Sequence, residues 1–128
     1  PQFCTERGDR CTPFDLSLSG KWIVLINPRL PISTAEAYAG VHPHEPDADL
    51  RESLTAPLAT WRTRVVNDFE RSLFPAYPIL PQLKEQLYEL GAAYASMSGS
   101  GSTLYGIFEN EPDTDNISAD FLVWKGRM

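Results

Sequence analysis

Two strand-like segments occupy the first part of the chain. Residues 3–14 are strand-like on either side of Gly8-Asp9, a turn pair typical of a β-hairpin. Residues 21–27 form a nearly continuous run of β-branched and aromatic side chains, which predicts a central strand buried on both faces. Pro28, directly after this run, ends the strand.

A short helix and a polar loop are expected next. Ser33 or Thr34 can cap a helix that Gly40 closes. The following loop, residues 42–49, is polar, and His42, His44 and Glu45 are its candidate metal ligands. Because prolines separate these residues in a flexible segment, a solvated loop is the better interpretation than a metal site.

Helical periodicity then replaces the strand pattern. One apolar stripe contains Leu50, Leu54, Leu58, Trp61 and Val65. Because Pro57 interrupts the stripe, one helix should end near Leu54 and a second should begin with Thr55 as its cap. A further helix is expected from Asn67, and a well-defined one carries the buried positions Leu80, Leu83, Leu87 and Leu90 before Gly91.

The last third returns to strands. Residues 93–97 and 104–108 read as two strands joined by a Gly/Ser loop at 98–102. An acidic loop at 109–116 leads to a last strand at 121–124. This order of elements predicts one α+β domain over residues 1–128, with helices packed on one face of an antiparallel sheet.

Composition and charge narrow the function classes. A hydrophobic content of 42% predicts a globular core, and a net charge of −6 argues against a nucleic-acid interface. The longest apolar run, residues 22–26, is too short to cross a membrane, and no secretion signal opens the chain, so a cytoplasmic protein is expected. Cys4 and Cys11 could face each other across the hairpin, but in a reducing cytosol two thiols are expected rather than a disulfide.

The loop at residues 98–102 carries the candidate chemistry. Gly99 and Gly101 permit positive φ and close approach of a ligand, and successive N–H groups of such a loop can bind an anion. Hydroxyl donors come from Ser98, Ser100 and Ser102. The loop lacks the Lys of a Walker A motif and leads into a strand, unlike a dinucleotide-binding fingerprint. It is therefore a candidate phosphate-contacting loop.

Four segments in order resemble the GHMP kinase family. Met97-Ser-Gly-Ser-Gly is similar to its third motif, in the form found in the branch that acts on diphosphocytidyl-methylerythritol. Gly8-Asp9 with Thr12-Pro13, the stretch 25–38 and Asn67-Asp-Phe-Glu70 resemble three further elements of that branch. The resemblance covers essentially the whole chain and implies the ferredoxin-like fold of the family's C-terminal domain.

The resemblance also implies a reaction and its site. ATP, with Mg²⁺, would phosphorylate the 2-hydroxyl of 4-diphosphocytidyl-2-C-methyl-D-erythritol, a step of non-mevalonate isoprenoid synthesis. Tyr38 matches an aromatic position of the family's cytidine pocket, and Thr34 and Ala35 match residues that line the ribose. The 98–102 loop would approach the diphosphate or the acceptor end. The motif at 67–70 is interpreted as a helix start, outside the catalytic set.

The family's nucleotide loop, catalytic Asp and companion Lys have no counterpart here. Together with the strand-like start directly after Pro1, this leads us to expect a segment of a longer protein, whose N-terminal domain would supply them. The chain alone is expected to hold no catalytic residue and no kinase activity. Two alternatives stay open: a GHMP kinase of homoserine or mevalonate type, and a non-catalytic α+β ligand-binding module.

Overall fold

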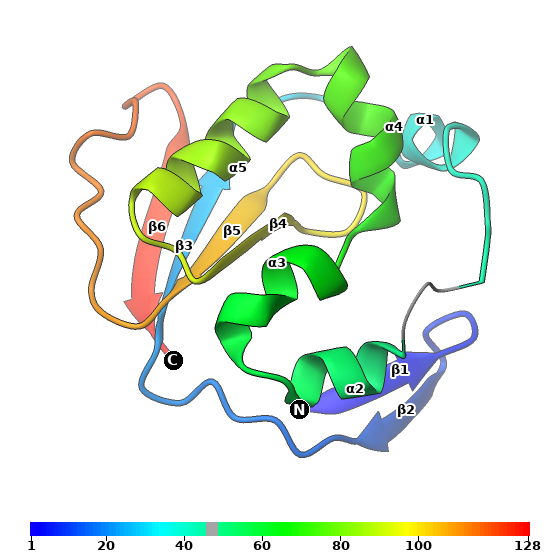
Figure 1. The fold of residues 1–128 in the computed structure, drawn as a ribbon. Coiled ribbons are helices and arrows are strands. Elements are labelled where there is room, and N and C mark those ends of the chain that lie inside the picture. The colour runs from blue at the N-terminus through cyan, green and yellow to red at the C-terminus, as the bar shows by residue number, and fades with distance from the viewer. Residues whose placement is uncertain (46–48) are drawn as a thin grey trace.

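A four-stranded antiparallel sheet organises the structure (Figure 1). Its strands lie in the order β4 (Tyr94–Met97), β5 (Leu104–Phe108), β3 (Trp22–Asn27) and β6 (Leu122–Arg127). The computed structural model describes residues 1–45 and 49–128, so part of the expected polar loop lies outside the described residues. The strand order is that of a ferredoxin-like sheet, and the prediction of a central strand at β3 is confirmed.

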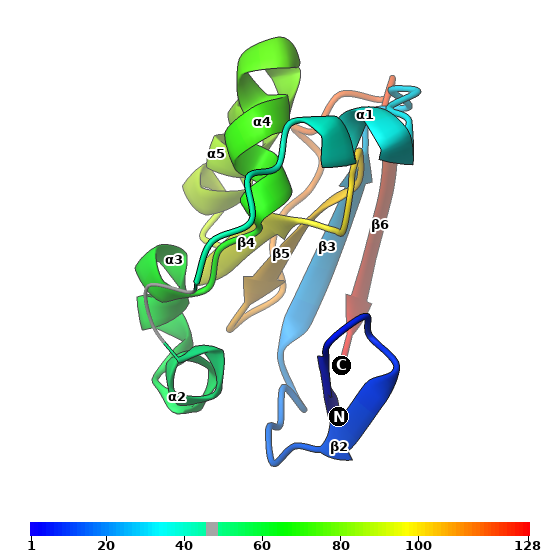
Figure 2. The ribbon, with the colours of Figure 1, turned by 90° about the vertical axis from the view of Figure 1, so that its right-hand side faces the viewer.

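The main helices cover one face of this sheet (Figure 2). They are α4 (Asp68–Ala76) and α5 (Ile79–Glu89). Leu80 and Leu87 of α5 are fully buried against Val24 and Ile26 of β3 in one apolar cluster. Complete burial of such a side chain stabilises the fold by about 1.5–3 kcal/mol. The α+β class is therefore confirmed, with its core between α5 and the sheet.

The opposite face is covered in part. Three short elements lie there: α2 (Leu50–Thr55), the 3₁₀ turn Leu58–Thr60 and α3 (Trp61–Arg64). Trp61 packs edge-on against Tyr94, with ring centroids 5.6 Å apart. Ile23 and Leu25 of β3 are half-buried on this side, so the expected burial of β3 on both faces is complete only on the helix side.

One predicted helix cap is wrong. Thr55 ends α2, and its hydroxyl donates to the Glu52 carbonyl instead of capping the next helix. Asp49 caps α2 by accepting from the backbone N–H of Arg51. The remaining predicted helix starts are confirmed at Ser33, which caps α1 (Thr34–Ala39), and at Asn67, which caps α4.

Gly40 ends α1 for a reason that the sequence did not reveal. Its φ is −94°, so no left-handed conformation requires glycine. A Cβ built at Gly40 would instead lie 2.5 Å from Cβ of Ser72 on α4. Because glycine has no side chain, α1 can pack closely against α4 at this position.

The hairpin of β1 (Gln2–Thr5) and β2 (Arg10–Pro13) forms as predicted, separate from the main sheet. Cys4 lies directly opposite Cys11 in the register, with Cα atoms 4.2 Å apart. The two residues form a disulfide, so the expectation of two thiols is wrong for this structure. Where the structure is described, it contains no helix long and apolar enough to cross a bilayer.

Candidate functional site

The two segments expected to bind substrate meet at one end of the sheet. In Figure 2 the loop between β4 and β5 reaches toward α1. The Ser102 hydroxyl donates to the Leu30 carbonyl at 3.1 Å, and Asn27 Nδ2 donates to Thr103 Oγ1 at 2.9 Å. These bonds join the 98–102 loop to the segment that leads into α1.

The loop adopts the conformation that its glycines were expected to allow. Gly99 and Gly101 have φ values of +53° and +88°, a region that disfavours other residues. The Gly101 N–H donates to the Ser98 carbonyl at 3.0 Å and closes the turn. Within the described chain, the backbone N–H groups of Gly99 and Ser100 have no hydrogen-bond acceptor. Two adjacent donors of this kind fit the oxygens of a phosphate.

The residues predicted on α1 are exposed. Thr34 and Ala35 lie in its first turn, and the Tyr38 side chain is 63% exposed. The Tyr38 and Phe69 rings form a T-shaped pair with centroids 5.0 Å apart. Tyr38 still keeps exposed surface that is available for stacking on a planar ligand.

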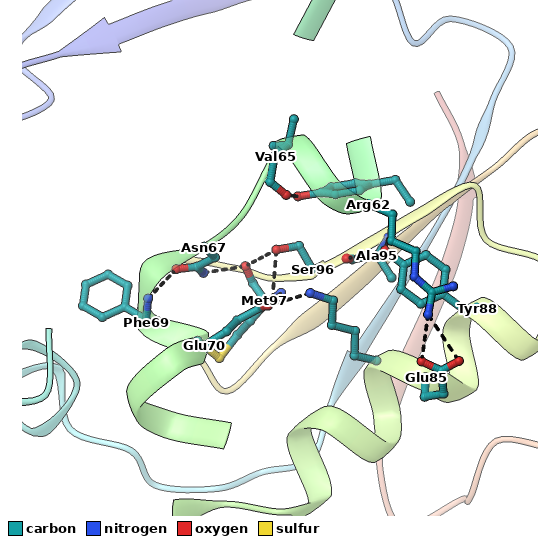
Figure 3. A network of polar contacts seen from close by, with 12 residues as sticks. Arg62, Val65, Asn67, Phe69, Glu70, Glu85, Tyr88, Ala95, Ser96 and Met97 are labelled. Carbon is teal, nitrogen blue, oxygen red and sulfur yellow. Dashed lines mark hydrogen bonds and ion pairs between the residues drawn. The ribbon is translucent and has the colours of Figure 1, made fainter. Parts of the chain in front are cut away.

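A polar network joins α4 to the start of the loop (Figure 3). Asn67 Nδ2 donates to the carbonyls of Met97 and Gly99, both at 2.8 Å. Glu70 Oε1 accepts from the Met97 N–H at 2.8 Å and from the Ser96 hydroxyl at 3.1 Å. Sequence reasoning assigned this motif to a helix start alone. Glu70 stands three residues after the capping Asn67, a spacing that is typical of a helix start and therefore gave no separate signal of the contact with the loop.

A surface hollow of about 450 Å³ lies beside the loop. Asn67 and Gly99 border it on one side, and Tyr94 and Tyr105 line it from the sheet. The Tyr94 hydroxyl donates to the Val65 carbonyl at 2.9 Å. Burial raises the pKa of the Tyr94 phenol far above its ordinary value, so this group stays neutral and serves as a donor.

His44, which the sequence placed in the polar loop, contacts α4. His44 Nε2 lies 3.4 Å from an Asp68 carboxylate oxygen and 3.2 Å from a guanidinium nitrogen of Arg71. Across residues 1–45 and 49–128, no group of three or more His, Cys, Asp or Glu side chains could hold a metal ion.

Comparisons with known proteins agree on one family. A family model described as "GHMP kinases C terminal" matches residues 49–121. The 4-diphosphocytidyl-2-C-methyl-D-erythritol kinase of Parabacteroides distasonis is 42% identical over 130 aligned residues, covering 100% of this chain and 48% of the relative. The enzyme of that name from Cytophaga hutchinsonii is 51% identical over 110 residues, covering 85% of this chain and 41% of the relative.

A solved structure of a kinase of this kind also resembles the chain. A crystal structure of 4-(cytidine 5'-diphospho)-2C-methyl-D-erythritol kinase superimposes with a TM-score of 0.64 at 28% sequence identity. The match covers 78% of this chain and 37% of that chain. The chain spans about half the length of the curated relatives that it matches.

Proposed function

The chain belongs to the GHMP kinase family, whose C-terminal part it carries, and we propose that the complete protein uses ATP to phosphorylate 4-diphosphocytidyl-2-C-methyl-D-erythritol at its 2-hydroxyl. The names and high identity of the relatives support this substrate. The observation that carries the proposal is structural: the 98–102 loop and the segment leading into α1 are joined by the hydrogen bond from Ser102 to Leu30.

Each segment has a task in this proposal. The N–H groups of Gly99 and Ser100 contact the diphosphate or the acceptor end of the substrate. Tyr38 stacks on the cytosine ring, and its 63% exposure is consistent with that task. Thr34 and Ala35, in the exposed first turn of α1, border the ribose.

ATP and Mg²⁺ would be bound largely outside this chain. The loop offers N–H and O–H donors, which fit phosphate oxygens, whereas Mg²⁺ prefers carboxylate and phosphate oxygens. When bound, Mg²⁺–ATP supplies the phosphoryl group and neutralises its charge. The nucleotide cradle and the catalytic base then come from the remaining half of the protein, which packs against this one as its partner. Residues 1–128 alone are expected to show no phosphoryl transfer.

A substrate panel tests the proposal. The complete protein and the 128-residue chain would each be incubated with ATP and one acceptor: 4-diphosphocytidyl-2-C-methyl-D-erythritol, mevalonate or homoserine. We expect ADP release only from the complete protein with the cytidyl substrate, with the new phosphate at the 2-hydroxyl by phosphorus NMR. Turnover of mevalonate or homoserine instead would assign another kinase of the family. An inactive complete protein would favour a non-catalytic module.

A further inference from the structure

We propose that Asn67 and Glu70 are positioning residues, which hold the first half of the 98–102 loop so that the N–H groups of Gly99 and Ser100 remain available to a phosphate. The inference rests on the proposed function, because it gives the loop a task in phosphoryl transfer. Together the two side chains are called the Asn67–Glu70 clamp.

Asn67 performs two tasks with one carboxamide. Its Oδ1 accepts from the Phe69 N–H at 3.0 Å and caps α4. Its two Nδ2 hydrogens bridge the carbonyls of Met97 and Gly99, each at 2.8 Å. A carboxamide supplies both an acceptor and two donors, whereas the other usual capping side chains, Ser, Thr and Asp, lack this pair of donors. Helix capping alone therefore does not explain the choice of Asn.

Glu70 holds the same stretch of backbone from its other side. Its side chain is only 11% exposed, and Oε1 accepts from the Met97 N–H. Its second oxygen pairs with Lys84 of α5. The N–H and the C=O of Met97 are thus both fixed by α4, and hydrogen bonds to a charged carboxylate are stronger than neutral ones.

The far end of the loop has its own anchor in the bond from Ser102 to Leu30. In this loop no described residue accepts from the backbone N–H groups of Gly99, Ser100 and Ser102, and the first two are adjacent at its centre. Because glycine samples many conformations, this centre depends on fixed ends for its shape. Misplacement by about 1 Å can slow a reaction about 100-fold, so the clamp acts on rate through the loop.

Two variants separate the clamp from the helix cap. Asn67→Ser and Asn67→Asp both keep a good cap for α4 but lose the donors to the loop. Asn67→Asp also places a carboxylate oxygen against two carbonyl oxygens, so its effect should be larger. In the complete protein we expect kcat/KM to fall by about 10-fold in the first and up to about 100-fold in the second. The melting temperature should fall in both variants through the two lost bonds to the loop, and further in Asn67→Asp. The matched control is Asp49→Ser, which replaces the capping side chain of α2 by a shorter one. This variant should leave kcat/KM unchanged.

A second readout does not require activity. Hydrogen exchange of the peptide spanning residues 97–103 should be faster in both Asn67 variants of the complete protein and unchanged in Asp49→Ser. Glu70→Gln keeps an acceptor for the Met97 N–H and should preserve slow exchange, whereas Glu70→Ala should not.

Unchanged exchange at 97–103 in Asn67→Asp, or wild-type kcat/KM in both Asn67 variants of an active protein, would overturn the clamp. If the unmodified protein phosphorylates none of the acceptors, the proposed function fails instead. The exchange comparison then still decides whether Asn67 holds the loop.

Discussion

Substitution of Gly40 by Ala tests the contact that sets α1 against α4. The new Cβ would lie 2.5 Å from Cβ of Ser72, whereas carbon atoms pack best at about 3.5–4.0 Å. The backbone at Gly40, with φ −94° and ψ −4°, accepts Ala without strain. Two backbones must therefore separate by about 1 Å, and such overpacking costs about 1–3 kcal/mol of unfolding free energy.

The double variant Gly40→Ala/Ser72→Gly supplies the control. Removal of the Ser72 side chain leaves only its Cα, 3.8 Å from the new Cβ, which is ordinary contact. Ser72→Gly alone should cost about 0.5–1 kcal/mol through helix propensity. Urea unfolding of the four proteins should show the double variant about as stable as Ser72→Gly. A Gly40→Ala variant as stable as wild type, or a double variant whose loss of stability is the sum of the two single losses, would show that the contact with Ser72 does not require glycine at position 40.

Three further predictions concern other parts of the fold. Tyr94→Phe removes the bond to the Val65 carbonyl and should lower the unfolding free energy by about 1–3 kcal/mol, whereas Tyr38→Phe should not, as urea unfolding would show. Because burial raises the pKa of Tyr94, the folded chain keeps a proton that the unfolded chain loses near its ordinary pKa of about 10. The contribution of Tyr94 to stability should thus be constant below about pH 10 and fall as pH rises beyond it, with tyrosinate absorbance appearing together with unfolding. The Cys4–Cys11 disulfide predicts a chain without alkylatable thiols under non-reducing conditions, and full alkylation there would contradict it.

Local chemistry explains which elements the sequence could predict. The turns at Gly99 and Gly101 and the cap at Asn67 depend on neighbours within a few residues, so their residue types were sufficient. The wrong cap at Thr55 arose because Thr is both a capping residue and an acceptable last helical residue, and the Pro57 signal did not distinguish them.

The features that the sequence could not predict depend on tertiary contacts. The bond from Asn67 to Met97 spans 30 residues of sequence, so no local pattern could reveal that the capping side chain also holds the loop. The need for glycine at Gly40 likewise comes from Ser72, which lies on another helix. The disulfide depended on the register of the hairpin, which puts Cys4 and Cys11 in one pair of facing positions.

The proposed function requires that the 98–102 loop and the segment 34–38 form one substrate-binding end. Hydrogen exchange of the complete protein, with and without 4-diphosphocytidyl-2-C-methyl-D-erythritol, tests this arrangement. We expect slower exchange in both segments on substrate addition, because Gly99 and Ser100 gain acceptors and α1 gains a stacked ring. Slower exchange confined to other segments, with 34–38 and 98–102 unchanged at saturating substrate, would contradict it.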